Sequence, residues 1–209
     1  MGTDIHGILQ GRNDVDHSWH TLDVMEDSRN YRLFAMLANV RNGFGFAGVP
    51  THTPYVPISE PRGLPGDLEV GPNFEVSLGP FIGSLYLGHP TTHWLGDHSH
   101  SWLTVDEILS HPHWDTPVFC TGVISREKFE QWKGGVPESW CGAIPGLDVG
   151  VTAAVYEPGD KIPINCAHVR IQWERTPRQE CPLFFKWLDY MQAKHAWGGE
   201  LRIVFGFDN

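Results

Sequence analysis

The chain has 209 residues, of which 41% are hydrophobic and 19% are charged. This composition supplies enough apolar side chains for a packed core and excludes a disordered chain, so we expect one domain spanning residues 1–209. The formal net charge at pH 7 is −10, with no run of Lys or Arg. Charge of this sign and distribution argues against an extended nucleic-acid footprint and against binding to anionic membranes.

The chain shows no targeting or cross-linking signal. No apolar segment reaches the length of a membrane span, and the first residues lack the basic and apolar regions of a signal peptide. We therefore expect a cytoplasmic protein. The four cysteines are far apart and form no Cys-x-x-Cys pair, which predicts reduced, structural thiols at Cys120, Cys141, Cys166 and Cys181.

The N-terminal segment carries a strand pattern. Alternating residues predict a first strand at 3–11, with Asp4 and His6 on one face and Ile5 on the other. A second strand at 19–25 is expected to pair with the first as a hairpin.

The next predicted element is a helix. An apolar stripe over residues 30–40 indicates this helix, with Ser28 or Asn30 as the N-cap and Gly43 as the residue that ends it. Residues 43–96 are rich in Gly and Pro but also contain many aromatic residues. This mixture favours an ordered, irregular insertion over a flexible linker.

The second half alternates helices and strands. Thr104 and Glu107 match a capping box, which predicts a short helix through Ser110. The remaining patterns predict strands at 118–124, 151–156, 167–174 and 201–207, and helices at 126–133 and 183–194. These elements predict an α+β fold, with a mixed or mostly antiparallel sheet and three to four short helices.

Two Asp/His clusters suggest a metal site. Asp4 and His6 are two residues apart on a predicted strand, so their side chains leave the same face roughly 7 Å apart. His98 and His100 repeat this spacing in the segment that follows Asp97. Because Asp and His are ligands of Zn, Mn and Fe, we predict one divalent metal ion held by Asp4, His6, His98 and His100. Asp97 is then either a further ligand or a catalytic group that orients a histidine.

The same clusters have a structural alternative. An Asp beside a His on a strand is often a satisfied polar pair, and His98 or His100 can cap the helix that follows. Either arrangement uses the same residue types, so the sequence leaves both open.

The glycine-rich segment 43–48 is a candidate ligand site. It satisfies the pattern G-x-G-x-x-G, but it follows a predicted helix, whereas dinucleotide binding requires a preceding strand. We therefore reject a Rossmann interpretation. The nearby residues instead predict a pocket for a nucleobase and a phosphate, with Arg41 neutralising the phosphate, lined by Arg41, Asn42, Phe44, Phe46 and Arg62. The structural alternative is a helix cap followed by a tight turn in the core.

Short segments resemble a known enzyme family. Asp4-Ile5-His6-Gly7 is similar to the opening D-x-H block of calcineurin-like metallophosphoesterases, and Gly96-Asp97 is similar to their second, G-D, block. The later Gly-Asn-His-Asp/Glu and Gly-His-x-His blocks of that family are missing here. The resemblance therefore implies a shared metal chemistry by analogy, without that family's layered fold.

A longer resemblance spans most of the chain. It rests on Gly2-Thr3-Asp4-Ile5-His6, the segments 41–48, 61–65 and 98–102, and the terminal Phe207-Asp208-Asn209. These segments resemble a family of bacteriophage and actinobacterial proteins. The resemblance implies a phage-type origin, and hence a host cytoplasm as location, but no reaction.

The sequence thus predicts a metal-dependent hydrolase that acts on a phosphoester or nucleotide-like substrate. The main alternative is a non-catalytic binding protein that contacts a host protein or a small nucleotide through the Gly/Pro-rich insertion. A third reading is a structural or assembly role in which the many aromatic residues form oligomer contacts.

Overall fold

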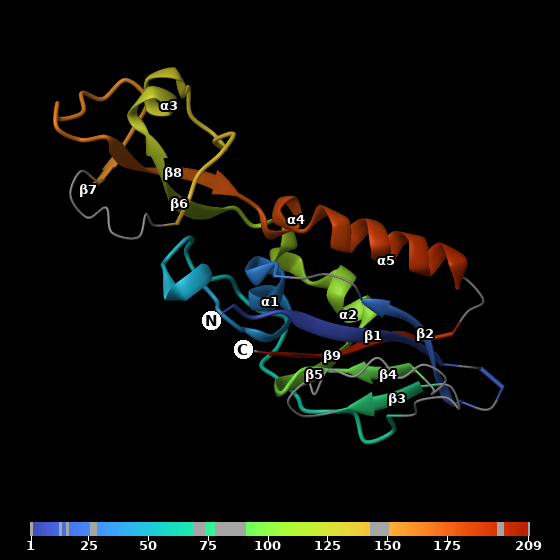
Figure 1. The fold of residues 1–209 in the computed structure, drawn as a ribbon. Coiled ribbons are helices and arrows are strands. Elements are labelled where there is room, and N and C mark those ends of the chain that lie inside the picture. The colour runs from blue at the N-terminus through green and yellow to red at the C-terminus, as the bar shows by residue number, and fades with distance from the viewer. Residues whose placement is uncertain are drawn as a thin grey trace.

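The computed structural model describes most of the chain and shows an α+β fold whose sheets are mostly antiparallel (Figure 1). The described residues are 2–12, 14–15, 17–25, 29–68, 74–77, 91–142, 151–195 and 199–208. Within these residues, no helix has the length and apolar character needed to cross a membrane.

A four-stranded antiparallel sheet, the large sheet, has the order β2-β1-β9-β5. Its strands are β1 (Ile5–Arg12), β2 (Trp19–Met25), β9 (Leu201–Phe207) and β5 (His98–Thr104). The predicted hairpin of the first two strands is confirmed. Because the C-terminal strand β9 lies between β1 and β5, the two ends of the chain lie side by side (Figure 1).

Helices cover one face of the large sheet: α1 (Tyr31–Ala38), α2 (Val105–Ser110) and α5 (Pro182–Lys194). Their apolar residues and those of β1 and β9 form the main core, which includes Ile5, Leu9, Leu37, Leu188, Ile203 and Phe205. A short 3₁₀ helix, η2 (Pro112–Asp115), adds the fully buried Trp114 to this core.

The opposite face of the large sheet is also covered. A parallel pair of short strands, β3 (Phe74–Ser77) and β4 (Thr91–Trp94), lies on this side (Figure 1). A second, smaller core forms around Ile8, Leu95 and Val204, with partly buried residues packed against it. The insertion 43–96 therefore contains these strands and the 3₁₀ helix η1 (Phe46–Gly48).

A second, three-stranded sheet, the small sheet, has the order β6-β8-β7. It contains β6 (Val118–Ser125), β8 (His168–Arg175) and β7 (Val151–Tyr156), with α3 (Arg126–Gln131) beside it. The predicted alternation on β8 is confirmed, since one face is buried in a core formed by Cys120, Ile124, Phe129, Val169, Ile171 and Trp173.

Three elements differ from the prediction or were not predicted. Helix α1 ends at Ala38 instead of Gly43, because Asn39 adopts the left-handed conformation and its N–H closes the last turn. The segment 98–104, for which no strand is predicted, forms β5 and pairs with β9. A fifth α-helix among the described residues, α4 (Pro177–Glu180), begins at its own capping box, formed by Thr176 and Gln179.

Candidate functional site

The two predicted Asp/His clusters lie at the same end of the large sheet, on strands separated by β9. His6 on β1 is opposite Gly206 of β9. The ring of His100 lies over the same glycine, since a Cβ built on Gly206 would be 2.6 Å from His100 Cδ2. Because Gly206 has no side chain, the His100 ring can pack directly against β9.

Asp208, which the metal prediction did not include, links the two clusters. Its Oδ1 accepts a hydrogen bond from the Asp4 N–H (2.7 Å), and its Oδ2 is 3.4 Å from His6 Nε2. His98 Nε2 lies 3.2 Å from the Asp208 carbonyl oxygen. The His6 ring also packs against Trp94, with ring centroids 4.4 Å apart.

The carboxylate of Asp4 has a different partner. Arg29 donates two hydrogen bonds to it, at 2.9 and 3.1 Å, and this contact lowers the pKa of Asp4. His100 Nε2 lies 3.2 Å from the Gly96 carbonyl oxygen, and the exposed Asp97 donates its backbone N–H to Phe207. In the described part of the chain, no group of three or more His, Cys, Asp or Glu side chains is arranged to hold a metal ion.

The predicted substrate-binding residues do not form one pocket. Arg41 donates to the Thr3 hydroxyl (2.7 Å), and its guanidinium lies over the Tyr31 ring, 4.9 Å from the centroid. The Asn42 side chain accepts a hydrogen bond from the Tyr55 N–H and donates one to the Tyr55 carbonyl, which fixes the backbone at Tyr55.

Arg62 lies elsewhere. It forms a bidentate ion pair with Glu107 at 2.8 and 3.2 Å, and it covers the ring of Trp102. The prediction that Arg62 joins the glycine-rich segment in one pocket was wrong, because the capping-box glutamate on α2 holds the guanidinium beside β5.

The segment 43–50 forms a tight turn with an exposed tip. The Gly45 N–H donates to the Val49 carbonyl (2.7 Å), and Ala47 has a positive φ of 56°. Phe46 is 61% exposed and Phe44 is 45% exposed, so the alternative of a turn within the core was wrong. Among residues that the structure describes, Phe46 contacts no other ring, and its side chain lines a cleft.

This cleft, which we call the Arg32 cleft, lies between the start of α1, the turn 43–52 and the segment 140–142 beside the small sheet. Its volume of about 570 Å³ is typical of small-molecule sites. Charged and aromatic residues line it, chiefly Arg29, Tyr31, Arg32, Phe46, Trp140 and Glu180. Asn30 caps α1 here by accepting from the Leu33 N–H, so the positive end of the helix dipole faces the cleft.

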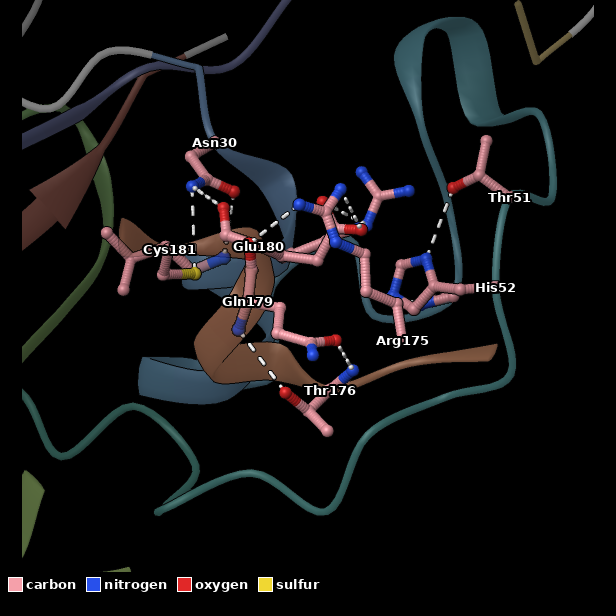
Figure 2. A network of polar contacts seen from close by, with 11 residues as sticks. Asn30, Thr51, His52, Arg175, Thr176, Gln179, Glu180 and Cys181 are labelled. Atoms are coloured by element: carbon pink, nitrogen blue, oxygen red, sulfur yellow. Dashed lines mark hydrogen bonds and ion pairs between the residues drawn. The ribbon is translucent and has the colours of Figure 1, made fainter. Parts of the chain in front are cut away.

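Two arginines, Arg32 and Arg175, share the carboxylate of Glu180, which lines the Arg32 cleft; Figure 2 labels Arg175 and Glu180. Arg32 Nε is 3.4 Å from Glu180 Oε2, and Arg175 Nη1 is 3.2 Å from Glu180 Oε1. The guanidinium of Arg32 also lies over Trp140, 5.4 Å from the ring centroid. This cluster carries one more positive charge than negative charge.

His52 lines the Arg32 cleft and is neutral. The Gly43 N–H donates to His52 Nε2 (3.3 Å), so the ring proton is on Nδ1 and donates to the Thr51 hydroxyl (3.1 Å; Figure 2). Burial, and then the charge of Arg32, lower the pKa of His52 to about 4. The neighbouring Tyr55, whose ring centroid is 4.5 Å away, has a pKa raised well above its usual range by burial.

No protein-family model, no curated protein and no solved structure matches this chain. The resemblances to metallophosphoesterases and to bacteriophage proteins therefore stay predictions. The class that the structure establishes is an α+β protein with a cleft, lined in part by arginine and aromatic residues, between the start of α1, the turn 43–52 and the segment 140–142.

Proposed function

We propose that the protein binds a small, nucleotide-like ligand, an aromatic ring that carries an oxyanion, in the Arg32 cleft. The observation that carries this proposal is the convergence of arginine and aromatic side chains on one concave site of about 570 Å³. Aromatic side chains stack on bases, while arginine donates paired hydrogen bonds to phosphate and carboxylate groups.

Phe46 supplies the aromatic half of the proposed site. An exposed ring at the tip of a tight turn buries apolar area when a ligand stacks on it. The turn is rigid, because three backbone hydrogen bonds within residues 45–49 hold it. A preformed ring of this kind loses little conformational entropy on binding.

The test is a thermal-stability screen with the common nucleoside 5′-monophosphates and the matching nucleosides. We expect a concentration-dependent rise in melting temperature with at least one of them. Phe46→Ser should weaken the binding of that ligand by about 1–3 kcal/mol, which is roughly fivefold or more in the dissociation constant. Phe119→Ser is the matched control, since Phe119 is 53% exposed but lies outside the cleft. The proposal fails if no compound stabilises the protein or if both variants bind as the wild type does.

Metal-dependent hydrolysis of a phosphoester is a second candidate function. The observation that favours it is the meeting of His6 and His98 with Asp208 at one end of the large sheet. There a divalent ion would supply Lewis-acid chemistry, with Asp4 and His100 as further candidate ligands.

Elemental analysis of the purified protein tests this candidate. We expect about one Zn, Mn or Fe per chain, lost in His6→Ala and Asp208→Asn but retained in His113→Ala, whose half-buried imidazole lies beside His111 and Thr116, away from these residues. Protein that stays metal-free after incubation with these ions would remove the hydrolase from consideration.

A further inference from the structure

We infer that Arg32 is the oxyanion-binding residue of the cleft and that Glu180 competes internally for it when no ligand is bound. This inference rests on the proposed ligand-binding function and names the group that the ligand must carry. It follows from how charge is distributed around the cleft.

The first step is the imbalance between cations and anions. Glu180 is the one carboxylate that Arg32 and Arg175 share, and its side chain is only 11% exposed. Arg29, the other arginine of the cleft, is neutralised by its bidentate pair with Asp4. Among the described residues, one positive charge therefore remains uncompensated at Arg32 and Arg175.

The second step separates these two arginines. Arg32 lines the cleft, whereas Arg175 does not. Arg32 Nε and Nη2 make no hydrogen bond with any residue that the structure describes, although both atoms are buried. Buried donors without acceptors are costly, so an incoming oxyanion gains these hydrogen bonds and displaces only the 3.4 Å ion pair between Arg32 Nε and Glu180.

The third step concerns Glu180. Its contact with Arg32 is an ion pair at 3.4 Å that does not meet hydrogen-bond geometry, while Arg175 holds the other carboxylate oxygen at 3.2 Å. Glu180 can thus remain paired with Arg175 while a ligand oxyanion takes the Arg32 donors. Glu180 lowers the affinity of Arg32 for anions, because its negative charge repels them and partly neutralises the guanidinium.

The chemistry fits either a phosphate or a carboxylate group, since both match the planar donors of a guanidinium. Trp140, which stacks on that guanidinium, holds it in one plane. The test therefore compares both kinds of anion.

The experiment measures melting temperatures of the wild type and of Glu180→Gln in phosphate, acetate and chloride at equal ionic strength. Removing the carboxylate leaves two arginines without a counter-ion, so we expect phosphate or acetate to stabilise Glu180→Gln by about 2–4 °C more than the wild type. The larger of the two shifts identifies the oxyanion. Equal shifts in the wild type and in Glu180→Gln would overturn the inference, whatever the nucleotide screen shows.

A second variant keeps the inference testable if Glu180→Gln does not fold. Arg32→Gln leaves Glu180 paired with Arg175. It should lower the affinity for a nucleoside monophosphate about tenfold or more and leave the affinity for the matching nucleoside unchanged. Arg178→Gln is the control, because its partner Asp115 lies outside the cleft. If Phe46→Ser weakens binding but Arg32→Gln does not, the cleft binds a ligand and the assignment of Arg32 is wrong.

Discussion

His52 is the residue whose ionisation has the clearest consequence for stability. Its pKa is about 4 in the folded protein, against an ordinary value of 6.5. The unfolded chain therefore takes up a proton that the folded one does not, and stability falls as the pH is lowered from about 6.5 towards about 4. The full loss from this residue is about 3 kcal/mol.

Urea unfolding of the wild type and of His52→Gln at several pH values in that range measures this loss. We expect the wild type to lose up to about 3 kcal/mol more than the variant on acidification, because glutamine does not titrate. Parallel pH profiles for the two proteins would contradict the assignment of a neutral, buried His52.

Two aspartates provide a matched comparison of ion pairs. Asp67 pairs with Arg202, which is 2% exposed and also bonds Gln10, whereas Asp4 pairs with the exposed Arg29. Asp67→Asn leaves a buried cation without its counter-ion, and we expect it to lower the free energy of unfolding by about 2 kcal/mol. Asp4→Asn should cost much less, since exposed pairs contribute little. Equal losses in denaturant unfolding would contradict this contrast.

The sequence predicts only those parts of the candidate sites whose residues are close together in the chain. The spacing of Asp4 and His6 predicts that both side chains leave the same face of the first strand, and His6 lies at the start of β1. It gives no indication of Asp208, because that partner lies 204 positions from Asp4 in the sequence. Glu180 is equally remote from Arg32, so a charge cluster of this kind has no local signature.

At the scale of elements, the turn before β5 depends on Gly96. This residue has a φ of 76°, and a Cβ there would overlap the backbone of Phe207 on β9. Gly63 has a similar φ of 79° but faces open space. We expect Gly96→Ala to destabilise the protein by about 3 kcal/mol or more and Gly63→Ala by about 1 kcal/mol.

Chemical denaturation of both variants measures the difference. Both variants place alanine in a left-handed conformation, so this strain contributes equally to the two losses. The difference between the losses measures the cost of the overlap between the turn and β9. Similar losses in the two variants would show that β5 does not depend on this close approach.

Elements with strong local signals are predicted well. The capping box of α2 and the alternation on β8 are both confirmed. Strand β5 escapes prediction because a bulge between His98 and Ser101 interrupts its alternation. The early end of α1 escapes because Asn39 adopts a conformation for which glycine is the usual signal.

At the scale of the whole molecule, the Arg32 cleft joins segments that are far apart in the sequence. The start of α1, the turn that carries Phe46, the segment at Trp140 and the end of α4 all contribute to it. Of the five residues predicted to bind substrate, only Phe46 lines the cleft. The α+β class follows from local patterns, whereas the cleft follows from how these distant segments pack together, which no local pattern specifies.

The most direct test of ligand binding in the Arg32 cleft is an NMR titration that follows the indole N–H signals of ¹⁵N-labelled tryptophans. Trp140 lines the cleft, Trp94 packs against His6 at the Asp/His clusters, and the fully buried Trp114 serves as reference. Substitution of each by phenylalanine assigns its signal. On addition of a stabilising nucleoside monophosphate, the Trp140 signal should shift while those of Trp94 and Trp114 stay in place. A shift of Trp94 with no change at Trp140 would contradict the account and place the ligand at the Asp/His clusters.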